Sequence, residues 1–268
     1  MKSLKNRPIG IFDSGLGGLT VVKSIRQCLP SEDIVYYGDT ARVPYGNKSR
    51  TTIVRFAHEI MAFMMKARVK MVVVACNTAS SLSLRSLKKT YPIPVIGVIS
   101  PGVREALSVS KNKRIGIIGT KSTINSKSYE KEILKLGGKA CRFFSKSCPL
   151  FVPLVENKFL NNKITYDVAQ HYLGEFKSRD IDTLILGCTH YPILKQVIKK
   201  VMGNINLVDS SFVVSKEVQM LLDKKDLTRF SKKTQGTLKI FVSDDVEGFR
   251  SAAGIFLKEK IMVKKVVL

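Results

Sequence analysis

Short runs of valine and isoleucine, separated by longer amphipathic stretches, most constrain the fold of this 268-residue chain. The runs do not alternate with polar residues, which is typical of strands buried on both faces of a parallel sheet. Alternation of such strands with helices indicates an α/β fold with helices on both faces of the sheet. We predict strands at residues 8–12, 34–38, 70–75, 94–99, 114–119, 183–187, 205–208 and 238–243.

The stretches between these runs have helical periodicity. Apolar residues of segment 17–29 share one helical face, and Pro30 ends the pattern. Methionine and phenylalanine form a broad apolar stripe in segment 51–67, which we expect to lie in the core. In the sequence ISPGV, we expect Pro101 and Gly102 to break the pattern before a second series of strands and helices.

Hydropathy and charge limit the partners. The longest apolar runs fall well short of the roughly 20 residues that a membrane helix needs, and the first is too short for a signal peptide, so we expect a cytoplasmic protein without membrane partners. Lysine and arginine number 45 against 21 aspartate and glutamate, a net charge of +24 that favours anionic partners. The lysines are scattered and accompany no nucleic-acid-binding motif, so a solvated basic surface is the favoured interpretation and nucleic acid the alternative.

The chain has five cysteines, an odd number, and no two of them form a CxxC pair. Neither a disulfide framework nor a zinc site has support in this spacing, and we expect no metal. Each thiol is therefore either a small buried apolar group or a reactive group. The five are Cys28, Cys76, Cys141, Cys148 and Cys188.

Polar residues and two of the cysteines follow the predicted strands, at the edge where α/β sheets bind ligands. Asp13 and Ser14 follow the first strand, and Asp39 follows the second. Cys76 in ACNTASS and Cys188 in GCTHYP each lie where we expect a strand to be followed by a helix N-terminus. The helix dipole at such a position favours the thiolate, so this paired context indicates function.

Three kinds of thiol chemistry are candidates for two such cysteines. A disulfide oxidoreductase would prefer CxxC on one loop, which is absent here, and a cysteine hydrolase needs one thiol with a histidine, for which His190 is available. Two thiols acting as proton carriers on opposite faces of a carbon acid suit the matched contexts best. The glycine-rich loop after Asp13 is a poor match to a dinucleotide-binding fingerprint, because Thr20 stands where the third glycine should be. Asp39 could take the place of the ribose-binding acid, so nucleotide binding is the less favoured alternative for this loop.

These motifs resemble those of the glutamate racemases, in the aspartate/glutamate racemase superfamily. The resemblance runs in order from residue 9 to about residue 210, through IGIFDSGLGGLTV, YYGDTARVPYG, VVACNTASS, VIGVISPG, IGIIGT, CPLFVPLVE and LILGCTHYPIL. It implies two pseudo-symmetric α/β domains with mainly parallel sheets flanked by helices, and an active site in the interdomain cleft. We expect residues 1–99 and 210–268 to form the first domain and residues 100–209 the second.

The resemblance also implies the chemistry. Cys76 would exchange the α-proton of D-glutamate and Cys188 that of L-glutamate, with no cofactor and no metal, to supply D-glutamate for peptidoglycan. Asp39 and Glu156 would be auxiliary polar groups around the thiols, whereas Cys28, Cys141 and Cys148 would be structural. The implied substrate-binding residues are Asp13, Ser14, Tyr45, Gly46, Asn77, Thr78, Thr189 and His190.

Simpler roles stay open for several of these residues. Asp13 and Asn77 could be plain helix caps, His190 could satisfy a buried hydrogen bond, and Glu156 could be a solvated loop acid. The alternative functions are racemisation of aspartate and nucleic-acid binding on the same scaffold. The expected partner is glutamate as a small-molecule substrate, and a homodimer stays open.

Overall fold

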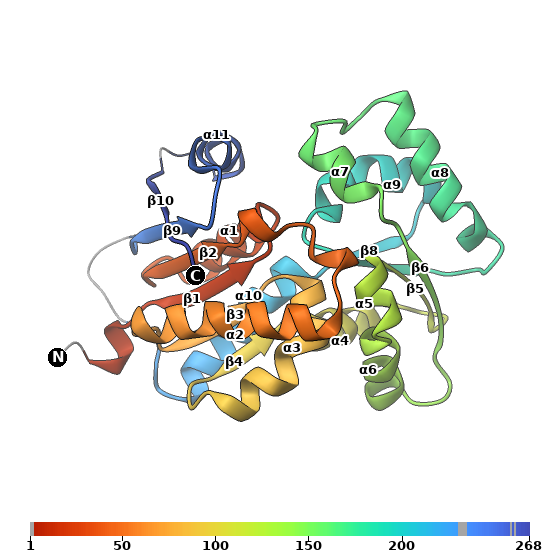
Figure 1. Ribbon diagram of the computed structural model, residues 1–268. Coiled ribbons are helices and arrows are strands. Elements are labelled where there is room, and N and C mark those ends of the chain that lie inside the picture. Colours follow the sequence, from red (N-terminus) through yellow and green to blue (C-terminus); the bar gives the residue numbers. More distant parts are fainter. Residues whose placement is uncertain (1–2, 230–234, 258, 260) are drawn as a thin grey trace. The chain divides into compact units, whose positions relative to one another are not determined.

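The computed structural model describes residues 3–229, 235–257, 259 and 261–268. Its contacts divide the chain into two compact units. Unit 1 comprises Met1–Val98 and Ser211–Leu268, and unit 2 comprises Ile99–Ser210. Each unit is built around its own parallel sheet (Figure 1).

The sheet of unit 1 has six strands in the order β10-β9-β2-β1-β3-β4, and every neighbouring pair is parallel. The central strands are buried throughout, because helices cover both faces. The strands are β1 (Ile9–Asp13), β2 (Ile34–Gly38), β3 (Met71–Val74), β4 (Val95–Gly97), β9 (Leu238–Val242) and β10 (Val263–Lys265).

The helices of unit 1 form two layers. One core cluster joins one face of the sheet to α1, α10 and α11, and another joins the opposite face to α2 and α3 (Figure 1). The helices are α1 (Leu19–Cys28), α2 (Arg50–Lys66), α3 (Asn77–Thr90), α10 (Ser210–Lys224) and α11 (Val246–Leu257). Short 3-10 helices cover Leu4–Asn6, Thr40–Arg42 and Tyr45–Asn47.

Unit 2 repeats the plan with four parallel strands in the order β6-β5-β7-β8. Helices α4 and α6 pack on one face of this sheet, and α7, α8 and α9 pack on the other. The strands are β5 (Arg114–Gly119), β6 (Arg142–Ser147), β7 (Thr183–Gly187) and β8 (Asn206–Asp209). The helices are α4 (Ile99–Val109), α5 (Lys121–Asn125), α6 (Ser128–Gly137), α7 (Phe151–Glu156), α8 (Lys163–Lys177), α9 (Lys195–Met202) and the 3-10 helix η4 (Tyr191–Leu194).

The predicted α/β class is confirmed, and each predicted strand is present with its ends within two residues of those expected. Strands β6 and β10 were not predicted. The expectation that Pro101 and Gly102 break the helical pattern is wrong, because both lie in the first turns of α4. Proline is tolerated there, where its missing N–H has no intrahelical partner to lose. None of the helices in the described part of the chain has both the length and the apolar character to cross a membrane.

Candidate active site

Cys76 is the N-cap residue of α3. Its carbonyl oxygen accepts the N–H of Ser80 at 2.8 Å, which is the first hydrogen bond of the helix, and its Sγ accepts the N–H of Ala79 at 3.5 Å. The residue is 5% exposed. The thiol therefore lies at the positive end of the helix dipole, where negative charge on sulfur is favoured, as the sequence predicted.

The end of β1 brings Asp13 and Ser14 to the same edge of the sheet. Ser14 Oγ lies 3.8 Å from Cys76 Sγ. Asp13 is fully buried, and its Oδ2 accepts the N–H of Gly18 at 2.8 Å, so this carboxylate holds the glycine-rich loop at the start of α1. A side chain at position 18 would place its Cβ 2.5 Å from Asp13 Cβ and 2.7 Å from the Tyr36 hydroxyl oxygen, so this close approach requires glycine.

Asp39 follows β2 and is fully buried within a polar network. Its carboxylate accepts hydrogen bonds from Arg42 Nε at 2.7 Å, from Ser243 Oγ at 3.0 Å and from the Tyr45 hydroxyl. Burial and the negative charge of Asp39 raise the pKa of Tyr45, which keeps its phenol protonated. This network fixes the segment containing Tyr45 and the buried Gly46 beside the strand ends.

Asn77 and Thr78 are the first two residues of α3 and are almost completely buried. They lie next to Cys76 in the chain, so the structure gathers Asp13, Ser14, Cys76, Asn77 and Thr78 at the carboxyl edge of the unit 1 sheet. Tyr36 also lies in this region, and no sequence pattern had pointed to it. Its hydroxyl donates to the Gly15 carbonyl at 2.5 Å, and burial with the charges of Asp13 and Cys76 raises its pKa.

Cys188 follows β7 directly, but it does not cap a helix, which corrects the predicted matching context. The chain turns through Thr189 and His190 into η4, and α9 begins only at Lys195. The physical reason is Pro192. In a helix capped by Cys188, the first hydrogen bond would need an N–H four residues on, and proline has none.

The polar environment of Cys188 comes from side chains instead. His190 Nδ1 lies 3.8 Å from Cys188 Sγ, and His190 Nε2 lies 3.3 Å from Oε1 of Glu156 at the end of α7. Cys188, Thr189 and His190 are all buried, whereas the Glu156 side chain is 44% exposed. The structure therefore aligns thiol, imidazole and carboxylate in one chain of contacts within unit 2.

Three further residues affect the surroundings of Cys188, and none of them was predicted to belong to the site. Burial and the negative charge of Cys188 raise the pKa values of Tyr129 and Tyr191, and the Tyr191 hydroxyl donates to the Cys148 carbonyl at 2.8 Å. Burial raises the pKa of Cys148 itself, which keeps that thiol neutral. Tyr191 lies within GCTHYP and could have been found there, whereas nothing in the sequence around Tyr129 indicates a role.

The remaining cysteines are not paired in disulfides; all five thiols are free. Cys141 is buried and donates to the Gly137 carbonyl, and Cys28 is half-buried beside Gln219. Within the described ranges, no three His, Cys, Asp or Glu side chains cluster in a way that could hold a metal ion.

Comparison with known proteins identifies the family of this chain. The profile of the Asp/Glu/Hydantoin racemase family matches residues 9–214, from β1 into α10. The chain belongs to this family. It is therefore an isomerase of the racemase class.

Relatives within the family are glutamate racemases. That of Aquifex aeolicus (strain VF5) is 46% identical over 256 residues, which are 96% of each chain. That of Aquifex pyrophilus is 55% identical over 207 residues, covering 77% of this chain and 80% of the relative. The crystal structure of glutamate racemase from Francisella tularensis in complex with D-glutamate aligns with a TM-score of 0.92 at 40% identity, over 98% of both chains.

Proposed function

We propose that this racemase interconverts L- and D-glutamate without a cofactor, with Cys76 and Cys188 as the two proton carriers. The observation that carries the proposal is the match, over nearly the whole chain, to glutamate racemases, one of them solved with D-glutamate. Two buried thiols, each within two residues of the end of a β-strand and each with its own polar neighbours, support the same chemistry.

The reaction transfers one proton in each of two steps. One cysteine, as the thiolate, takes the α-proton, and the carbon–hydrogen bonding pair stays on the substrate as an enolate-like carbanion. The other cysteine, as the thiol, gives its proton to the opposite face of that carbon and becomes a thiolate. By the family resemblance, Cys76 serves D-glutamate and Cys188 serves L-glutamate.

On the Cys76 side, backbone N–H groups at the start of α3 suit the substrate α-carboxylate, which gains negative charge in the transition state. The side chains of Asn77 and Thr78 would donate to the same group. Ser14 would orient the thiol, and Asp13 would hold the glycine-rich loop and meet the substrate ammonium group. Asp39, with Tyr45, would keep this edge of the sheet in shape.

On the Cys188 side, the imidazole of His190 would stabilise the thiolate that takes the α-proton of L-glutamate, and in the reverse reaction the Cys188 thiol gives its own proton to the carbanion. Glu156 would keep that imidazole oriented through the 3.3 Å contact with Nε2. Thr189 would help to hold the γ-carboxylate of glutamate. With aspartate, these donors would be left unpaired at a cost of about 1–3 kcal/mol for each buried group, so glutamate is the preferred substrate.

The product has a defined use in this proposal. D-Glutamate would supply peptidoglycan synthesis in the cytoplasm of a bacterium, as the bacterial origin of the related glutamate racemases suggests.

The test is circular dichroism of the purified protein with L-glutamate and, separately, with D-glutamate. Both signals should decay to zero, and L-aspartate should decay far more slowly. Equal kcat/KM for aspartate would move the assignment to aspartate racemisation. No decay with either amino acid, together with tight and salt-sensitive DNA binding, would favour the nucleic-acid alternative that the net charge of +24 keeps open.

A further inference from the structure

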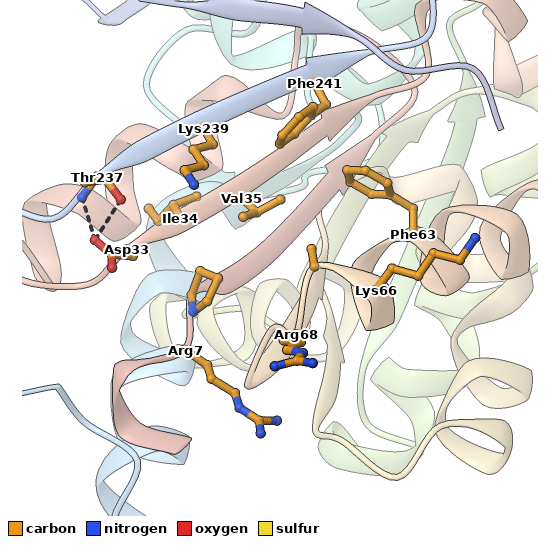
Figure 2. Close-up of a pocket in the computed structure, with 12 residues that line it drawn as sticks. Arg7, Asp33, Ile34, Val35, Phe63, Lys66, Arg68, Thr237, Lys239 and Phe241 are labelled. Carbon is orange, nitrogen blue, oxygen red and sulfur yellow. Dashed lines mark hydrogen bonds between the residues drawn. The ribbon is translucent and has the colours of Figure 1, made fainter. Parts of the chain in front are cut away.

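A pocket of about 610 Å³ opens on unit 1 (Figure 2). It lies at the end of the sheet where the strands begin, whereas Cys76 lies beyond the end of β3. Its lining includes residues at the amino-terminal ends of the strands, among them Pro8 before β1, Ile34 at the start of β2 and Thr237 before β9. Asp13 and Asp39 lie at the carboxyl ends of the same strands. Since a strand of five residues spans about 17 Å, the pocket is separate from the candidate active site.

The hollow follows from how the sheet is covered. Helices α2 and α3 cover one face, and the register pairs Val35 with Lys239 and Tyr37 with Phe241, so these β9 side chains project on that face. Phe63, near the end of α2, packs edge-on against Phe241 with ring centroids 5.2 Å apart. Figure 2 shows both rings among the side chains that line the pocket, so this part of its wall is apolar and aromatic.

The rim of the pocket is basic. Arg7, Lys66, Arg68 and Lys239 line it, and none makes an ion pair or side-chain hydrogen bond with another residue in the described ranges. Asp33, the carboxylate in the lining, does not pair with these four cations, because it already binds Arg229 and Thr237.

Asp33 pairs with Arg229 and accepts two hydrogen bonds from Thr237, at 2.7 Å to its N–H and 2.8 Å to its hydroxyl. Despite partial burial, these contacts lower the pKa of Asp33, so it stays charged and bound to them. The neighbouring Lys5 and Lys70 likewise have carboxylate partners, Asp226 and Glu32. The four rim cations therefore differ from the neighbouring Lys5 and Lys70, which have carboxylate partners.

We propose that this pocket binds a small anion with a flat apolar body, such as an aryl sulfonate, carboxylate or phosphate. The apolar body would lie on Phe63 and Phe241, and the anionic group would meet the guanidinium and ammonium groups of the rim. The volume falls in the range of about 300–1,000 Å³ that is typical of small-molecule sites. This inference goes beyond the proposed racemisation and does not depend on it.

The probe is 8-anilinonaphthalene-1-sulfonate, whose fluorescence rises on binding, with uncharged N-phenyl-1-naphthylamine as its counterpart. The pocket variant replaces two exposed rim cations (R68Q with K239Q). The control variant removes the same charge from exposed sites of unit 1 outside the pocket (K23Q with K225Q). Neither probe reports turnover, so the result is independent of the racemisation assay.

We expect the sulfonate to bind the pocket variant about tenfold more weakly than the parent protein, because two charge contacts are lost. The control variant should bind it as the parent does, and the uncharged probe should bind all three proteins alike. Equal sulfonate affinity in the two variants would overturn the proposal, since attraction would then depend on net charge alone. An equal loss of both probes in the pocket variant would also overturn it.

Discussion

Cys76 and Cys188 each lie within two residues of the end of a buried parallel strand, yet the chain holds them in different ways. Four residues after Cys76, the N–H of Ser80 closes the first turn of α3. Four residues after Cys188 stands Pro192, and a turn and a 3-10 helix replace the α-helix start. The first thiol therefore has a helix terminus, and the second has the imidazole of His190.

In the proposed mechanism, the two cysteines would carry out the same proton transfer while different groups stabilise them. Every substitution except one to proline leaves a backbone N–H group in place, whereas an imidazole and its carboxylate can each be removed by changing one side chain. Substitutions around Cys188 should therefore affect proton transfer more selectively than substitutions within α3, which should mainly affect folding.

The largest effect should be common to the two regions. Cys76→Ala and Cys188→Ala should each lower kcat by about 10³-fold or more, because one proton carrier is lost and the reaction cannot be completed on that face. Circular dichroism with both enantiomers measures the loss. Cys141→Ala, in a buried thiol away from both sites, should keep full activity, and a Cys76 or Cys188 variant as active as that control would contradict the two-thiol mechanism.

The role of the α3 N-terminus in holding Cys76 can be tested by placing a proline four residues after Cys76, where Pro192 stands relative to Cys188. Ser80→Pro should lower the free energy of unfolding by about 3 kcal/mol or more, since it removes the Ser80 N–H and places a ring against the Cys76 carbonyl. Pro192→Ala should change it by less than about 1 kcal/mol. Urea denaturation compares both with Ser80→Ala, and a Ser80→Pro protein no less stable than Ser80→Ala would show that the α3 start is not what holds Cys76.

Isotope effects should distinguish the two thiols. Glu156→Gln should lower kcat/KM about tenfold in both directions, because the enantiomers have equal free energies and the oriented imidazole is lost. The deuterium isotope effect should rise with α-deuterated L-glutamate and fall with α-deuterated D-glutamate. Ser14→Ala, whose hydroxyl lies beside Cys76, should give the opposite pattern, and the same pattern in both variants would refute the assignment of thiols to enantiomers.

The smallest effect concerns the stability of unit 2 in acid. Asp182 accepts hydrogen bonds from Ser110 Oγ at 2.7 Å and from the N–H groups of Lys111 and Asn112 at 2.6 and 2.9 Å. Although burial opposes this, these bonds lower its pKa in the folded state. The unfolded chain then binds more protons, so this stabilisation is present above the unfolded pKa of about 3.9 and is lost as pH falls through the folded value.

Asp182→Asn should therefore cost about 1 kcal/mol at pH 7 and almost nothing at pH 2, as measured by urea denaturation at the two pH values. Asp180→Asn removes an exposed carboxylate two residues away and serves as the control. An Asp182→Asn penalty that is equal at both pH values would show that the carboxylate charge plays no part.

The strands were predictable where burial on both faces leaves a continuous apolar run, as in β1, β3 and β7. Strand β6 was missed because it is a half-exposed edge strand, RFFSKS, whose polar residues resemble a loop. Strand β10 is only three residues long and two of them are lysines. Such edge strands are specified by their neighbour in the sheet more than by their own composition.

The candidate site was predictable where its residues lie at or just beyond the ends of strands, since parallel strands bring Asp13, Ser14 and Cys76 to one end of the sheet. The contact of Ser243 with Asp39 was not, because it depends on β9 pairing with β2, some 204 residues away in the chain. The two cysteine motifs look alike in sequence, so the effect of Pro192 was not foreseen. Pro192 prevents an α-helix from starting at Cys188, because it lacks the N–H that would make the first hydrogen bond of that helix.

The proposal that two bases act on opposite faces is tested most directly by racemising protiated D-glutamate in D2O and following the α-position by NMR at early times. Cys188 would deliver a solvent-exchanged deuteron, so the L-glutamate formed should carry deuterium while the remaining D-glutamate keeps its proton. The mirror result should hold when the reaction starts from L-glutamate. L-Glutamate that retains the original proton of the substrate would mean that a single base removes and returns it, and would contradict the two-cysteine mechanism.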